Sequence, residues 1–388
     1  MSLEECLGKM KKIQENLLDY LNDEANYEVK FQCIVKKCDE IKNDDKISKI
    51  KSMLHLLSKI SDNYHYTADF FNKINRVLQL FKDEMKKKFT NIDIFNIFKR
   101  NKRILLFLFD EKIITFDEKI AKMMTKDKYM KSEYPSYFSP EIKPFVKSKW
   151  FPKDGLTSFY IENDEWLEDK CFYEKRKNGQ NDDLICQFIQ KDLIDDFITY
   201  VNKNSYSLKY KIKSSIYETN NFLLEKEETT LIEYAAFYGS IQIFNYLRLN
   251  GIELTSSLWN FAIHGKNAEI IHLLEENHIQ PPKCLNKNKD DISYEKIFIE
   301  SIKCHHNDIA NYIQNNFLNK KSKEILISAI KFCNYEFIQN IDIIDDSAFY
   351  FLCKYDYDFL VTILSKRTDI DINKLIVIYE KKKYLIQF

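Results

Sequence analysis

Glycine and proline are scarce in this sequence, with six of each in 388 residues. Average glycine usage is about 7%, and loops that hold phosphate groups need glycine because their backbone amides must approach the anion closely. The six glycines form neither a G-x-G-x-x-G motif nor a P-loop. We therefore predict no nucleotide site of either kind and no cofactor.

Long apolar runs and net charge are also missing. The most apolar run, Ile104 to Phe109, has six residues, whereas a membrane-spanning helix needs about 20. The 59 lysines and arginines equal the 59 aspartates and glutamates, so no overall field favours nucleic acid or acidic membranes. We predict no membrane span and no nucleic-acid partner.

The nine cysteines lack the short, regular spacings of a disulfide framework, and the amino-terminal MSLEECLGKM has no apolar signal-peptide core. Both features indicate reduced thiols in a cytoplasmic protein, with the nucleus as the alternative compartment. Cys33 and Cys38 have no second pair or histidine close in sequence, so we interpret them as packing residues.

Helical periodicity dominates what is present. Apolar residues recur every three or four positions from Ile47 to Ile60 and from Phe70 to Phe81, which places them on one helical face. Four of the six prolines fall between Pro135 and Pro152, among aromatic residues, and predict an irregular connector that packs against a domain. Alternation of period two is nowhere sustained, so the predicted fold class is all-α. The predicted segments are an N-terminal helical region (1–125), a proline- and aromatic-rich connector (126–180) and a repeat domain (181–388).

A set of small and apolar residues returns several times in the carboxyl-terminal half. In TTLIEYAAFYGSIQIFNYLRLNGIEL, Ala235 and Ala236 permit close helix approach, and Gly239 is placed to end the first helix. Further copies are LWNFAIHGKNAEIIHLLEENHI, FIESIKCHHNDIANYIQNN, ISAIKFCNYEFIQNI and SAFYFLCKYDYDFLVTIL, with a degenerate first copy in ICQFIQKDLIDDFITYV. Ile243 and Ile270 occupy equivalent positions, 270 − 243 = 27 residues apart, and the next steps are 39 and 28. Such periods indicate stacked helix pairs.

These residues resemble the ankyrin repeat, whose signature is a unit of about 33 residues that opens on T-P-L-H-x-A. The segment TLIEYAA (230–236) occupies the start of that motif. Together with KRNKRILLFLFDEK, SYFSPEIKPF, FYEKRKNGQND and SIKCHHNDIANYI, it is similar to an uncharacterised, lineage-expanded protist family of ankyrin-like proteins over roughly residues 90–340. The resemblance implies an N-terminal helical region followed by an ankyrin-like helix-pair solenoid, and it implies no activity or catalytic residue.

Two polar patterns invite chemistry, and each has a structural interpretation that we prefer. His305 and His306 beside Cys304 suggest zinc, but zinc needs four converging ligands and adjacent histidines point apart. We therefore predict a turn between helices there and no metal. The basic KRNKR segment (99–103) is the best candidate for contact with an anionic surface, while solvated helix faces are the preferred interpretation.

The predicted function is a protein-binding scaffold or adaptor of the ankyrin type, monomeric and without catalytic activity. In stacked helical repeats, exposed positions of each first helix line one surface, and aromatic residues there are frequent binding hot spots. The residues predicted to form this surface are Glu233, Tyr234, Phe237, Tyr238, Trp259, Asn260, Ile263 and His264. The alternative is an effector or enzyme whose site lies in the N-terminal helices, marked by a deep polar pocket lined by His55, His65 or a cysteine.

Overall fold

The computed structural model describes residues 3–338, apart from 45, 66, 68, 149, 152–169, 227, 283–290 and 319–321, together with 350–353, 355, 357 and 361. Helices make up most of this described chain, and its only strands are the short antiparallel pair β1 (Lys211–Ile212) and β2 (Thr229–Thr230). The predicted all-α class is confirmed. Among the described helices, none is long and apolar enough to cross a membrane.

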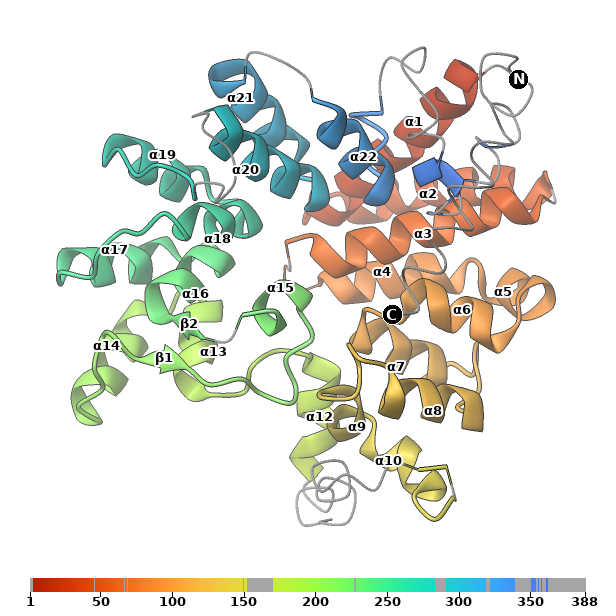
Figure 1. Cartoon of the computed structure of the whole chain (residues 1–388), viewed down its shortest axis with the longest axis horizontal. Coiled ribbons are helices and arrows are strands. Elements are labelled where there is room, and N and C mark those ends of the chain that lie inside the picture. Colours follow the sequence, from red (N-terminus) through yellow and green to blue (C-terminus); the bar gives the residue numbers. More distant parts are fainter. Residues whose placement is uncertain are drawn as a thin grey trace. The chain divides into compact units, whose positions relative to one another are not determined.

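The chain divides into two compact units (Figure 1). Unit 1 comprises Met1–Ile60, Thr67–Phe81 and Pro281–Phe388, and unit 2 comprises Ser61–Tyr66 and Lys82–Gln280. The helices of unit 1 are α1 (Leu3–Asn22), α2 (Tyr27–Asn43), α3 (Ile47–Asn63, whose last residues belong to unit 2), α4 (Phe70–Gln79), α20 (Asp291–Lys303), α21 (Asn307–Phe317) and α22 (Lys323–Lys331). Besides the two strands, unit 2 contains α5 (Lys82–Lys88), α6 (Asn91–Phe98), α7 (Lys102–Asp110), α8 (Glu118–Lys126), α9 (Tyr134–Tyr137), α10 (Ser139–Ile142), the 3-10 helix η1 (Lys143–Phe145), α12 (Lys170–Asn178), α13 (Leu184–Gln190), α14 (Ile194–Lys203), α15 (Asn221–Leu224), α16 (Leu231–Tyr238), α17 (Ile241–Leu249), α18 (Leu258–Gly265) and α19 (Ala268–Glu276).

These units do not follow the three predicted segments, because unit 1 joins the first helices of the chain to the last ones. The Gln14 side chain of α1 donates a hydrogen bond to Asn334 Oδ1 at 2.8 Å and accepts one from the Tyr335 amide at 2.7 Å. Lys11 and Glu336 form an ion pair at 2.9 Å. The hydrogen-bonded groups are buried, so breaking the contact would leave polar atoms without water.

Helices α3 and α4 form because each carries one continuous apolar stripe. The stripe residues with no exposed surface are Ile50, Leu54, Leu57, Ile60, Phe70, Ile74, Val77, Leu78 and Phe81. Ile47, at the first position of α3, is the exception, with 51% of its surface exposed. The predicted helical faces are otherwise confirmed.

The segment that the prolines marked as irregular is built from short helices up to residue 145. Pro135, Pro140 and Pro144 each lie in the first turn of α9, α10 or η1, where a missing amide donor costs no intrahelical hydrogen bond. The aromatic rings of this segment pack as predicted, with Phe138 5.8 Å from Phe109. The prediction of a packed connector is confirmed and the prediction of irregular backbone was wrong here.

Helices of unit 2 from α13 onwards pack in pairs. The pairs are α13 with α14, α16 with α17, and α18 with α19. The first helices also contact each other, α13 with α16 and α16 with α18, and α14 contacts α17 (Figure 1). Each apolar helix face is thus covered by its own pair and by the neighbouring pair.

The same turn closes the first helix in each pair. At Gly239, with φ +68°, the amide donates to Ala236 O, and the next amide, of Ser240, donates to Ala235 O. This double hydrogen bond is the Schellman arrangement, which satisfies carbonyls at a helix end and requires a left-handed residue.

Left-handed residues recur at this position along the chain. They are Asp192, Gly239 and Lys266 in unit 2 and His305 and Cys333 in unit 1. From Gly239 their separations are 266 − 239 = 27, 305 − 266 = 39 and 333 − 305 = 28 residues. These are the predicted steps, so the backbone repeats with the period that the sequence indicated. The copy that contains residues 358–360 lies outside the described residues.

Candidate functional site

The residues predicted to form an exposed surface lie on α16 and α18 of unit 2. The structure buries Tyr234, Phe237, Trp259, Ile263 and His264. Trp259 Nε1 donates a hydrogen bond to Ile279 O at 2.6 Å. The Phe237 ring stacks 5.5 Å from His264 and 5.8 Å from Phe222. The expectation that these five side chains are exposed was therefore wrong.

A close approach between first helices explains this burial. A Cβ atom built on Gly265 would lie 2.0 Å from the carbonyl oxygen of Ala236, so the backbones of α16 and α18 touch where neither has a bulky side chain. Helix α16 is also covered by α13. A helix with a neighbour on both sides keeps few positions for solvent, and sequence alignment alone does not tell which ones.

Glu233, Tyr238 and Asn260 remain half-buried. The Glu233 carboxylate accepts the Thr230 amide at 2.9 Å, which completes a capping box, and the Ser257 hydroxyl at 2.6 Å. This carboxylate therefore fixes the start of α16. The predicted surface is too small to carry binding by itself.

Aromatic side chains meet at the surface on the first helix pair of unit 2. Phe188 of α13 lies 5.6 Å from Tyr200 of α14, Tyr200 stacks 5.6 Å from Tyr206, and Tyr206 lies 5.1 Å from Tyr210. All four rings are half-buried. The flanking leucines are more exposed, with 45% of Leu184 and 41% of Leu193 accessible. We call Phe188, Tyr200, Tyr206, Tyr210, Leu184 and Leu193 the aromatic surface.

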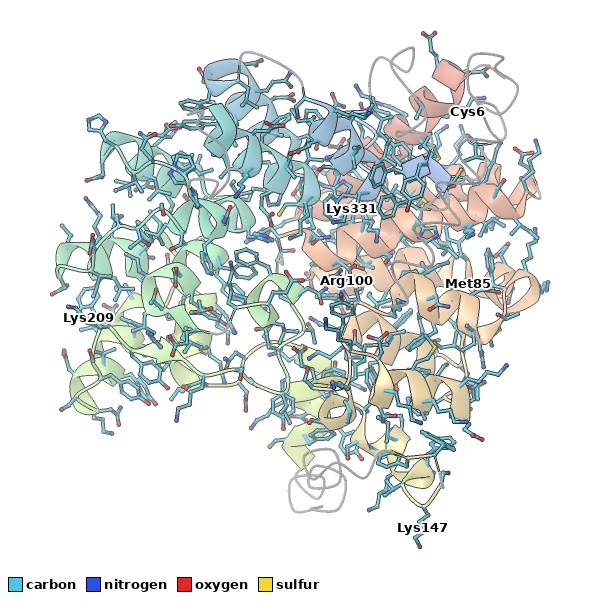
Figure 2. The ribbon with its side chains drawn as sticks, in the orientation of Figure 1. Cys6, Met85, Arg100, Lys147, Lys209 and Lys331 are labelled. Carbon is cyan, nitrogen blue, oxygen red and sulfur yellow. The ribbon has the colours of Figure 1, made fainter. Side chains whose placement is uncertain are left out.

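Local structure fixes these rings. Asp183 caps α13 by accepting the Ile185 amide, and the left-handed Ser205 turns the chain back after α14. Burial and then the neighbouring Tyr206 hydroxyl raise the pKa of Tyr200, so its phenol is neutral at physiological pH. Lys209, on the same loop, is exposed (Figure 2). The surface thus offers ring faces and hydroxyls with a cation at its edge.

Unit 2 also buries a cluster of ionisable groups. Lys102 Nζ lies 3.5 Å from the Glu133 carboxylate. Glu218 accepts the amides of Thr219 at 2.9 Å and Asn220 at 2.8 Å. Burial lowers the pKa of Lys102 and raises that of Glu218. Perturbed buried groups are candidates for catalysis, so the space around them decides their role.

The cavity beside Glu218 is small. Its volume of about 30 Å³ suits one water molecule and not a substrate. The second carboxylate oxygen of Glu218 has no hydrogen-bond partner among the described protein atoms, which a single water would satisfy. We interpret this cluster as structural.

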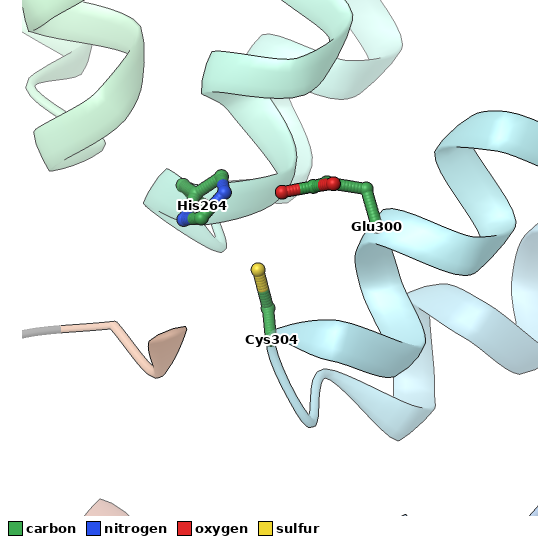
Figure 3. Close-up of side chains that lie close together, drawn as sticks. All are labelled: His264, Glu300 and Cys304. Carbon is green, nitrogen blue, oxygen red and sulfur yellow. The ribbon is translucent and has the colours of Figure 1, made fainter. Parts of the chain in front are cut away.

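The residues of the predicted zinc alternative form a helix end and a turn. Cys304 follows the last residue of α20, one turn after Glu300 (Figure 3). Burial, and then the Glu300 charge, raise the pKa of Cys304 well above its usual value, which disfavours the thiolate that zinc binds. His305 is the left-handed turn residue and His306 precedes α21, as predicted. His264, also labelled in Figure 3, belongs to unit 2 and stacks there on Phe222 at 4.1 Å.

The basic KRNKR segment is engaged within unit 2. Lys102 is 1% exposed and Asn101 is fully buried, where it caps α7. Arg100 pairs with Glu225 at 3.0 Å. This leaves little of the segment for the anionic contact that made it a candidate.

The alternative of an enzyme required a deep polar pocket lined by a histidine or a cysteine. One cavity of unit 1 is lined by Cys6, but its surface is mostly apolar, and burial raises the pKa of the Cys6 thiol. Burial likewise lowers the pKa of His65 to about 4, so this imidazole is neutral. Neither group is poised as a nucleophile or a base at neutral pH.

Comparison with known proteins gives no match. No family model, no curated protein and no solved structure is similar to this chain. The aromatic surface was missed in the sequence because ICQFIQKDLIDDFITYV was interpreted only as a first repeat. A terminal repeat has no neighbour on one side, and that is the signal by which its outer aromatic residues stand out.

Proposed function

We propose that this protein is a protein-binding scaffold of the ankyrin type, monomeric and without catalytic activity, in the cytoplasm or nucleus. The observation that carries the proposal is the recurring left-handed turn at steps of 27, 39 and 28 residues, which matches the repeated helix-pair pattern. Ankyrin-type arrays use their extended surface to hold other proteins.

The aromatic surface is the contact region that we assign to this function. Tyrosine side chains bury a large area at a small entropic cost and dominate many interfaces. The exposed Leu184 and Leu193 beside them add apolar area that the chain leaves in water. Half-buried rings are also held in place before a partner arrives, which reduces the entropy lost on binding.

The test is capture of partners from a lysate of the native cell by the full chain. The variant carries Tyr200→Ser and Tyr206→Ser, and the control carries Tyr129→Ser, because Tyr129 is 81% exposed and lies outside the helix pairs. Hot-spot residues contribute about 2 kcal/mol or more each, so at least one specific partner should fall by roughly tenfold or more.

The control should retain that partner at the wild-type level. Equal capture by all three proteins, measured by quantitative mass spectrometry, would refute the aromatic surface as the contact region. Circular dichroism of each variant checks that the helices remain folded.

A further inference from the structure

Unit 1 contains a cavity of about 470 Å³ lined by α1, α2 and α3. Its volume falls in the range of about 300–1,000 Å³ that ligand pockets occupy. The residues that line it are Glu5, Cys6, Gly8, Lys9, Met10, Lys12, Ile13, Lys37, Glu40, Ile41, Lys49 and Ser52. The cavity is distinct from the aromatic surface, which lies in unit 2.

The floor of this cavity is apolar. Cys6 and Met10 lie on successive turns of α1, and Ile41 approaches from α2. These three side chains are buried, and most of the surface inside the cavity is apolar. The Ser52 hydroxyl donates to Ser48 O at 2.8 Å, so it adds no unsatisfied polar group.

The rim of the cavity is basic. Four lysines and two glutamates line it, which leaves an excess of two positive charges. The lysines are paired with carboxylates, Lys9 with Glu5 at 2.9 Å and Lys37 with Glu40 at 2.9 Å among them. Such exposed pairs are weak, and they exchange readily for the carboxylate of a ligand.

The positive charges gather at the Cys6 end. Burial raises the pKa of the Cys6 thiol, while Lys49 and then Lys9 act against this rise, so both ammonium groups lie close to the sulfur. An anionic group at this end would have cations beside it, with the apolar floor extending away along α1.

We propose that this cavity binds a free medium- or long-chain fatty acid, with its carboxylate at Lys9 and Lys49 and its hydrocarbon chain over Met10 and Ile41. An apolar floor accepts the chain, and the excess of positive charge at the rim selects an anionic head group.

Gly8 provides the first test. It lies on α1 and lines the cavity, and a Cβ atom built on it meets no atom within 4 Å. Gly8→Trp should therefore fill the cavity without displacing the backbone, and Gly8→Ala is the matched control. Dodecanoate is titrated into each full-length protein by calorimetry, below its micelle concentration. Gly8→Ala should bind like the wild type, and Gly8→Trp should bind at least tenfold more weakly. Equal binding by all three would overturn the proposal.

The head group is tested with dodecanol and dodecyltrimethylammonium. Dodecanoate should bind at least tenfold more tightly than either, and Lys9→Gln with Lys49→Gln should remove most of this difference. Octanoate should bind far more weakly than dodecanoate, by about fourfold for each methylene lost from the contact. No preference among the three head groups would overturn the assignment to an anion.

Cys6 offers a measurement that does not depend on a variant. Dodecanoate should slow its modification by a small thiol reagent at least fivefold, as peptide mass spectrometry would show. The exposed thiols Cys33 and Cys171 are internal controls and should react at an unchanged rate. Uniform rates at all three cysteines would contradict a ligand in this cavity.

Discussion

Gly265→Ala should destabilise unit 2 although alanine favours helices. The added methyl group would lie 2.0 Å from Ala236 O and 2.9 Å from the Gly239 nitrogen. Both are backbone atoms, so no side chain can rotate out of the way. Helices α16 and α18 would have to separate, and the packing between them would loosen.

The expected loss follows from two opposing terms. Overpacking typically costs about 1–3 kcal/mol, and we take the upper end because a carbonyl is the obstacle. Replacing a glycine inside a helix by alanine returns about 1 kcal/mol. The net loss is about 2 kcal/mol, or roughly 6 °C in Tm for a unit of about 200 residues.

Gly8→Ala is the control for this prediction. Gly8 is an exposed helical glycine with open space around it, so the same methyl group should stabilise α1 by about 0.5–1 kcal/mol. Scanning calorimetry and urea unfolding of the full chain would measure both variants. Gly265→Ala at or above wild-type stability would refute the close approach of α16 and α18.

Two predictions concern pH. Burial lowers the pKa of His305 from 6.5 to about 3, so its contribution to stability is full above pH 6.5 and lost as the pH falls, by up to about 1.4 kcal/mol per pH unit. His305→Asn keeps a residue that tolerates the left-handed turn and should flatten urea-unfolding stability between pH 6.5 and 5; an unchanged slope would contradict a neutral His305. Burial raises the pKa of Glu218 above 4.5, so its contribution is present below pH 4.5 and declines as the pH rises through the folded pKa. Glu218→Gln should therefore gain stability relative to wild type from pH 4.5 to 8, and a constant difference would argue against a buried carboxyl.

Much of the fold was accessible from the sequence because apolar periodicity reports helices directly. The stripes of α3 and α4 and the turn at Gly239 are local patterns that need no knowledge of neighbours. The division into units was not accessible, since the Gln14 contact with Asn334 joins residues 320 positions apart.

The candidate site shows where local patterns stop being informative. Tyr234 and Trp259 have the residue types of a binding surface, yet hydrogen bonds to Gln190 and Ile279 place their polar atoms inside unit 2. Burial of a first-helix residue depends on how closely the next pair approaches, and Gly265 sets that distance.

The split composition of unit 1 bears on how the chain is synthesised. Its early part ends at residue 81 and its late part begins at 281, which leaves 281 − 81 = 200 positions between them. At about 5–20 residues per second, a ribosome needs roughly 10–40 s to cover that distance. During this interval the nascent α1 waits without Asn334 and Tyr335, while the helix pairs of unit 2 emerge complete. The order of translation therefore gives unit 2 the earlier opportunity to fold and exposes the first helices to chaperones.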